Sequence, residues 1–261
     1  MSANGNLLVA KFGTESNVIS GQISNAGYPD TEAINGYCKQ LGQLSSQYEL
    51  AVVISGAATV GASIVESSMQ GAVSKYSRRS LATIGNPMLF AAWQQSFNNH
   101  GKVAGQVIVS HAEMEDKKEG PKLVEAYADM RASGVIPLFN ENDVLETREM
   151  EELDKGGDND GLAAHIATRL GANRLLLLTA SADGFKVDDI VQQTVWSADI
   201  PDLAKHDYGV SNGGSGGIMP KLEAAATAVT DSSVGLRAFI GNAAANYQQI
   251  LVGQVGTEVV Q

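Results

Sequence analysis

Leu7-Leu8-Val9-Ala10-Lys11-Phe12-Gly13-Thr14 is a short aliphatic run that carries one lysine and closes on a glycine turn. Runs of the same kind recur at 50–54, 103–109, 135–139, 175–179 and, more weakly, at 234–240. Nearly continuous aliphatic runs of this length are typical of strands buried on both faces, as the strands of parallel sheets are. The first run therefore predicts a buried strand at Leu7–Lys11 that ends in a charged side chain.

Amphipathic stretches separate these runs, and they predict helices at 31–47, 79–99, 121–132, 161–170 and 220–229. The alternation of strand and helix predicts an α/β layered fold with right-handed crossovers. The sequence has no internal repeat and no low-complexity linker, so one compact unit is expected. Because ligands of such sheets collect at the carboxyl ends of the strands, the residues just after each run are the candidates for a site.

The composition limits the partners and the compartment. A formal net charge of −11 repels the phosphate backbone, so no nucleic-acid partner is expected. Cys38 is the only cysteine, which excludes an intramolecular disulfide and a cysteine-rich zinc site and fits a reducing compartment. The polar N-terminus lacks a signal-peptide pattern, and no apolar run is long enough to cross a bilayer. The sequence therefore predicts a cytoplasmic protein without membrane contact.

Three glycine-rich turns could hold phosphate groups. Two follow predicted strands, at Lys11-Phe12-Gly13-Thr14 and Ser55-Gly56-Ala57, and the third, Gly213-Gly214-Ser215-Gly216-Gly217, precedes the helix expected from Pro220. The exposed N–H groups and the dipole of a helix N-terminus favour an anion there. The sequence has no Walker A loop. One such loop alone is more often an ordinary turn, but three of them beside strand and helix ends favour a phosphate site.

Two polar clusters are candidates for substrate binding. Asn140-Glu141-Asn142-Asp143 follows the strand that ends at Phe139, and Gly157-Asp158-Asn159-Asp160 opens a helix. Asp and Asn at a helix start are usually caps. The two clusters could instead hold a polar amino acid, and spacing alone leaves both interpretations open. The four histidines lack metal-ligand spacing, so no metal site built from the protein is expected.

Two lysines occupy unusual positions. Lys11 ends an otherwise aliphatic strand, and Lys221 lies in the first turn of a predicted helix. A lysine is ordinarily a solvated side chain, but at a helix N-terminus its charge adds to the positive end of the helix dipole, which is mildly unfavourable. An anion bound at that place would offset the cost.

Taken in order, these segments resemble the amino-acid kinase family over nearly the whole chain. They are 8–14, 53–57, 136–143, 157–160, 176–179, 214–225 and the closing 253–257, and their order and the block Asn140–Asp143 are the specific features. The resemblance is strongest to the branch that phosphorylates L-glutamate, in a short form without the C-terminal RNA-binding-like domain of many relatives. It implies a three-layer α/β/α sandwich around a mostly parallel sheet. Within this single domain of 1–261, about 1–170 would form an amino-acid-binding lobe and about 171–261 a nucleotide-binding lobe.

The resemblance also implies a reaction, the transfer of the γ-phosphoryl of ATP to the side-chain carboxylate of L-glutamate. The product would be L-glutamyl 5-phosphate, made in the first step of proline biosynthesis. Mg²⁺ would be carried by the nucleotide phosphates, and the enzyme would be a homo-oligomer, a dimer or a tetramer. The implied catalytic residues are Lys11, Asp160 and Lys221. The implied substrate-binding residues are Ser55, Gly56, Ala57, Asn140, Asn142, Asp143, Asp158 and Asn159, and the nucleotide-binding residues are Lys11, Gly13, Thr179, Ala180, Ser215, Gly216, Gly217, Ile218, Met219, Pro220 and Lys221.

Some features depart from the family pattern. The segment between Asp143 and Asp160 is longer than the family's, Ala180 stands where an aspartate is usual, and Pro220 replaces a common threonine. Two alternatives stay open. One is another small-molecule kinase of the same fold, acting on aspartate, carbamate, a nucleotide or a phosphonate. The other is a non-catalytic paralogue that binds nucleotide.

Overall fold

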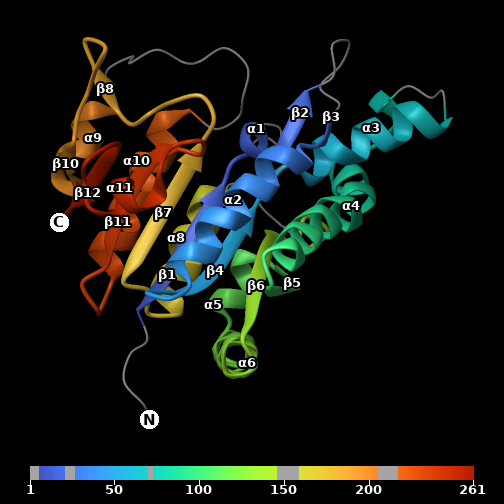
Figure 1. Ribbon diagram of the computed structural model, residues 1–261, viewed down its shortest axis with the longest axis horizontal. Helices are drawn as coiled ribbons and strands as arrows, with labels where there is room; N and C mark the ends of the chain where they lie inside the picture. Colours follow the sequence, from blue (N-terminus) through green and yellow to red (C-terminus); the bar gives the residue numbers. More distant parts are fainter. Residues whose placement is uncertain (1–5, 21–26, 70–72, 146–158, 205–216) are drawn as a thin grey trace.

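The computed structural model describes residues 6–20, 27–69, 73–145, 159–204 and 217–261. The described residues form an eight-stranded sheet with the order β10-β12-β11-β7-β1-β4-β6-β5 (Figure 1). Its strands are β1 (Leu7–Phe12), β4 (Glu49–Ile54), β5 (Val103–Val109), β6 (Val135–Glu141), β7 (Arg174–Thr179), β10 (Thr194–Trp196), β11 (Arg237–Asn242) and β12 (Thr257–Val260). Every strand predicted from an aliphatic run is present, although the weakest of them, β11, begins later than its run.

Strand β1 lies in the middle of the sheet. It pairs in parallel with β4 on one side and with β7 on the other, and β5, β6 and β11 extend the parallel pairing. Strand β12 runs antiparallel to β11 and carries β10 at the edge. The mostly parallel sheet is therefore confirmed. Because β1 pairs with β7, strands on both sides of the expected boundary near residue 170 share one sheet, and the division into two binding lobes stays a prediction.

Helices cover both faces of this sheet (Figure 1). One face carries α2 (Thr31–Leu44), α4 (Arg78–Asn99) and α11 (Tyr247–Leu251). The other carries α5 (His111–Glu115), α6 (Glu119–Ala132), α8 (Asn159–Arg169) and α10 (Ile218–Asp231). Along β1, the side chains of Leu8, Ala10 and Phe12 pack against the face that carries α2, α4 and α11. The side chains of Leu7 and Val9 pack against the opposite face. Successive side chains of a strand point to opposite faces, so each face has its own hydrophobic core and the fold is the expected α/β/α sandwich.

Several elements were not predicted from the sequence. They include α1 (Thr14–Asn17), α3 (Ala57–Met69), α5, α9 (Ile200–Leu203), α11, the edge strand β10 and its neighbour β12, and the hairpins β2–β3 (Val18–Ser20, Gly27–Pro29) and β8–β9 (Lys186–Val187, Ile190–Val191). The sequence of α3 mixes glycine, serine and β-branched residues, which are weak helix formers. Tertiary packing overrides this, because a β-carbon on Gly61 would lie only 1.8 Å from the carbonyl oxygen of Leu81 in α4.

No helix within the described ranges combines the length and the apolar character needed to cross a bilayer.

Candidate active site

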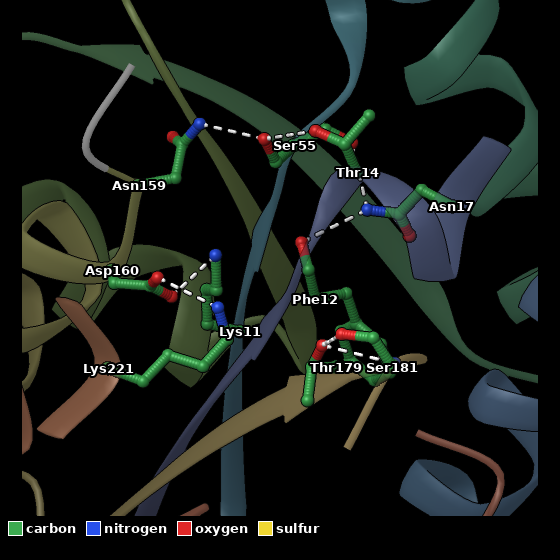
Figure 2. A network of polar contacts seen from close by, with 10 residues as sticks. All are labelled: Lys11, Phe12, Thr14, Asn17, Ser55, Asn159, Asp160, Thr179, Ser181 and Lys221. Atoms are coloured by element: carbon green, nitrogen blue, oxygen red, sulfur yellow. Dashed lines mark hydrogen bonds and ion pairs between the residues drawn. The ribbon is translucent and has the colours of Figure 1, made fainter. Parts of the chain in front are cut away.

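Three charged side chains from distant parts of the chain meet on the sheet face that α8 and α10 cover (Figure 2). The Nζ atom of Lys11 lies 2.5 Å from Oδ1 of Asp160, and the Nζ atom of Lys221 lies 3.1 Å from Oδ2 of the same carboxylate. The exposed fractions are 4%, 4% and 2% for Lys11, Asp160 and Lys221. We call these three residues the buried ion triplet. The structure brings together the three residues to which the sequence assigned catalysis.

Local structure explains why each side chain points to this place. Lys11 follows Val9 by two positions on β1, so it faces the same layer, where α8 and α10 pack. Asp160 and Lys221 lie in the first turns of α8 and α10. A carboxylate is favourable at the positive end of a helix dipole and an ammonium is not, so Asp160 offsets the unfavourable position of Lys221.

The buried ion triplet gathers two positive groups around one negative group. Burial by itself would raise the pKa of Asp160, but the ammonium groups of Lys11 and Lys221 outweigh it and hold the pKa below its ordinary value. The carboxylate is therefore ionised at neutral pH. Two ammonium groups held side by side in this way suit an anionic group such as a phosphate.

A second set of polar groups lies beside the triplet (Figure 2). Ser55 follows β4, and its Oγ lies 3.1 Å from Oγ1 of Thr14 and accepts a hydrogen bond of 3.0 Å from Nδ2 of Asn159. Asn159 is buried and directly precedes Asp160. Its Oδ1 has no hydrogen-bond partner among the described residues. We call Thr14, Ser55 and Asn159 the hydroxyl–amide cluster, and it offers both donors and acceptors to a small polar molecule.

The turn after Ser55 requires its glycine. Gly56 has a φ of +114°, which residues with a side chain rarely adopt. A β-carbon there would also lie 2.8 Å from Cγ2 of Val18. Ala57 follows as the buried first residue of α3. The predicted Ser55-Gly56-Ala57 turn thus connects β4 to a helix directly beside the hydroxyl–amide cluster.

The predicted Asn–Asp block lies at the end of β6. Asn140 is buried, its amide nitrogen donates to Oδ1 of Asn86 at 2.7 Å, and its own Oδ1 accepts from the backbone N–H of Glu141 at 2.9 Å. Asn142 and Asp143 are half-buried just beyond the strand. Their roles in substrate binding stay predictions.

The residues predicted to bind nucleotide on the strands lie at the ends of β1 and β7. The backbone N–H of Gly13 donates to the carbonyl oxygen of Leu178 at 3.2 Å. Oγ1 of Thr179 lies 3.0 Å from Oγ of Ser181, and Ala180 between them is exposed. Since the Gly13 N–H already has a protein partner, it is not available to a phosphate in this arrangement.

Five more of the predicted nucleotide-binding residues are described, and they lie at the start of α10. Gly217 directly precedes the helix, whose first residues are Ile218, Met219, Pro220 and Lys221. Proline is well tolerated near the start of a helix, because the N–H that it lacks has no helical partner there. Three predicted site residues, Asp158, Ser215 and Gly216, lie outside the described residues.

Three polar residues near the site were given no role of their own from the sequence, although Thr14 closes one of the glycine-rich turns named as a candidate phosphate site. Thr14 and Ser181 contact predicted residues through their hydroxyl groups. Asn17 is fully buried and donates to the carbonyl oxygens of Phe12 and Ser55. Their position just after a strand is the one signal that could have identified them, and Asn17 also resembles an ordinary turn residue.

The described residues contain no group of three or more His, Cys, Asp or Glu side chains that could hold a metal ion. Both carboxylate oxygens of Asp160 already contact ammonium groups. These side chains therefore fit a metal ion that is coordinated mainly by the phosphate oxygens of a nucleotide better than one coordinated by protein side chains alone.

The chain is similar in sequence to a known protein family and to individual proteins. A profile of the amino acid kinase family matches residues 6–242. Glutamate 5-kinase of Kosmotoga olearia is 27% identical over 244 residues, which are 90% of this chain and 64% of that protein. Glutamate 5-kinase of Cronobacter sakazakii is 30% identical over 230 residues, which are 85% of this chain and 60% of that protein. The chain thus spans about three-fifths of the length of these curated relatives.

A solved structure shares the whole architecture. Carbamate kinase from Giardia lamblia, bound to AMP-PNP, superposes with a TM-score of 0.64 over 100% of this chain and 99% of that one, at 13% identity. At that identity the likeness concerns the fold alone. The family profile, by contrast, extends over both lysines and the aspartate of the buried ion triplet. The chain belongs to the amino acid kinase family.

Proposed function

We propose that this protein transfers the γ-phosphoryl group of ATP to the side-chain carboxylate of L-glutamate. The observation that carries the proposal is the buried ion triplet, which holds two buried ammonium groups around one buried carboxylate. The membership of the chain in the amino acid kinase family supports phosphoryl transfer as the reaction. The relatives named glutamate 5-kinase support glutamate as the acceptor.

The chemistry requires little beyond positioning and charge. A carboxylate acceptor with a pKa of about 4 is already ionised at neutral pH, so no general base is needed. Lys11 and Lys221 would stabilise the negative charge that spreads over the transferring phosphoryl group. Asp160 contacts both lysines and would keep them at a fixed spacing. Transfer then depends on the in-line alignment of acceptor and phosphate.

The two ends of the site would hold the two substrates. The hydroxyl–amide cluster would bind glutamate, with Asp143 as partner of its α-ammonium group. Thr179 and Ala180 would lie along the nucleotide, and the start of α10 along its phosphates, where backbone N–H groups without helical partners favour anions. This assignment corresponds to the expected division into an amino-acid lobe and a nucleotide lobe.

Mg²⁺ would be bound mainly by the phosphate oxygens of ATP. When bound it neutralises part of the phosphate charge and supports the in-line geometry. The residues of this chain would contribute the ammonium groups on either side of the phosphates.

One assay tests the proposal. Incubation with ATP, Mg²⁺ and L-glutamate in the presence of hydroxylamine should trap the acyl phosphate as a hydroxamate. ADP release should then depend on glutamate. A panel of aspartate, carbamate, nucleotide and phosphonate acceptors, measured by ADP release, separates glutamate from the other acceptors of this fold. ATP binding without turnover on any acceptor would instead identify a non-catalytic paralogue.

If the proposal holds, the enzyme would make L-glutamyl 5-phosphate for proline biosynthesis in the cytoplasm. Assembly into a dimer or tetramer stays a prediction that light scattering can test.

A further inference from the structure

A buried asparagine connects the two strand ends that carry the site (Figure 2). Asn17 is the last residue of α1 and has no exposed surface. Its amide nitrogen donates to the carbonyl oxygen of Phe12 at 3.1 Å and to that of Ser55 at 2.9 Å. Phe12 ends β1, and Ser55 follows β4, its parallel neighbour. One side chain thus ties together the ends of two central strands.

The chemistry of the two partners fixes the direction of this amide. The nitrogen of a side-chain amide carries two N–H donors, and both partners of Asn17 are carbonyl oxygens, which only accept. A reversed amide would place its oxygen against both of them and leave them without donors in a buried place. The backbone is anchored as well, because the carbonyl oxygen of Asn17 accepts from the N–H of Asp30, the N-cap of α2, at 2.8 Å.

Ser55 is the residue through which Asn17 reaches the hydroxyl–amide cluster. Asn17 holds the carbonyl oxygen of Ser55, while the hydroxyl group of the same residue contacts Thr14 and accepts from Asn159. Thr14 and Asn17 belong to the same helical turn. This turn therefore restrains both the backbone and the side chain of Ser55, and with them the spacing between β4 and the glycine turn after β1.

We propose that Asn17 is a positioning residue that sets the distance between the acceptor-binding end of the site and Lys11. The inference rests on the proposed function, which assigns Ser55 and Asn159 to the acceptor. Without the two N–H donors, the turn after β4 keeps the strand pairing and the Thr14 contact but loses its side-chain link to Phe12, and the hydroxyl–amide cluster shifts relative to the lysine. Binding and in-line alignment of the acceptor would weaken, whereas the nucleotide end, on β7 and α10, would be unaffected.

Kinetics of matched variants test this role. Asn17→Leu replaces the amide by an apolar side chain of similar size. Ser63→Ala is the control. Ser63 is also buried, and its hydroxyl group donates to the backbone carbonyl oxygen of Gly27 at 2.7 Å. It has no role in the proposed site. We expect the KM for the acceptor to rise about tenfold in Asn17→Leu, with the KM for ATP within about twofold of wild type. In Ser63→Ala both constants should stay near wild type.

A second variant covers the case in which the leucine variant does not fold. Asn17→Ser keeps one donor on a shorter side chain, which can serve one of the two carbonyl oxygens through a bridging water, so its acceptor KM should fall between those of the wild type and Asn17→Leu. Graded loss with the number of donors is a result that a purely structural role would not give.

Hydrogen–deuterium exchange tests the positioning without any substrate. Peptides over 13–17 and 55–60 should exchange faster in the Asn17 variants than in Ser63→Ala, compared at denaturant concentrations that give equal global stability. A wild-type protein without glutamate-dependent turnover would refute the proposed function, and the exchange result would still decide on Asn17. Exchange in these peptides equal to that of the control, or an unchanged acceptor KM in an active Asn17→Leu enzyme, overturns the inference.

Discussion

Replacing Asp160 with asparagine removes the shared counter-charge of two buried lysines while keeping the shape of the side chain. With an effective dielectric constant of about 20, a unit-charge pair at the 3.1 Å that separates Lys221 from Asp160 attracts by about 5 kcal/mol, and Lys11 is closer still. Desolvation of the ions offsets much of this attraction, and breaking one partner out of a buried pair typically costs about 3–5 kcal/mol. We therefore expect Asp160→Asn to lower the free energy of unfolding by about 4 kcal/mol.

The same substitution should reduce catalysis more than binding. Without the shared carboxylate, the repulsion between the two ammonium groups would move both away from the transferring phosphoryl group, so kcat should fall about a hundredfold. The KM for glutamate should change little, because Asp160 does not contact the acceptor in the proposed arrangement. Urea unfolding measures the stability, and the hydroxamate assay measures both kinetic constants.

Two controls separate the buried ion triplet from charge effects in general. Glu119→Gln breaks the pair between Glu119 and Lys122, whose side chains are 53% and 65% exposed, and should leave the urea midpoint close to that of the wild type. Adding Lys221→Met to Asp160→Asn removes one of the two repelling charges, so the double variant should unfold at higher urea than the single variant while staying inactive. An Asp160→Asn protein with wild-type stability and wild-type kcat would refute the reasoning.

Asp143→Ala should raise the KM for glutamate and reduce kcat much less, because the α-ammonium group takes no part in the transfer; a fall in kcat alone, at saturating ATP, would contradict that role. L-Aspartate should be a poor acceptor, since one methylene fewer displaces the carboxylate by more than about an ångström from its in-line position. Equal kcat/KM for the two acids would argue against glutamate. Because the folded-state pKa of Asp160 is depressed, its contribution to stability is present above about pH 4 and is lost as the pH falls through the folded-state value. The urea midpoint should therefore fall less steeply with decreasing pH in Asp160→Asn than in wild type. Equal slopes of urea midpoint against pH would contradict this role of Asp160.

The fold could be predicted where the local signal and the tertiary environment agree. Strands β1, β4 and β7 are aliphatic over most of their length because helices cover both faces of the sheet. The edge strand β10 and its neighbour β12 are short, and β10 carries Trp196, with 57% of its surface exposed, so they show no aliphatic run. Helix α3 was missed because its stability comes from the close contact with α4 rather than from its own composition.

The charged part of the site was easier to predict than the neutral part. Lys11 is conspicuous because a charged residue interrupts an aliphatic strand, and the family resemblance connected it to Asp160 and Lys221. Asn17 gives no such contrast, since asparagine is common in turns and its burial depends on two strands that are far apart in sequence. Asn140 was predicted from the family resemblance to bind substrate, but nothing in the sequence indicated that its side chain contacts Asn86.

The central place of β1 in the sheet has a consequence for folding during synthesis. Strand β1 is synthesised before its two neighbours in the sheet, so it pairs with β4 early but meets β7 only after Arg174–Thr179 has been made. Until then its second edge is an unpaired, aliphatic strand, which is a template for association with other chains. Contacts between segments so distant in sequence also slow folding. Nascent chains stalled before residue 174 should therefore depend on chaperones, and release from that dependence should coincide with the emergence of β7.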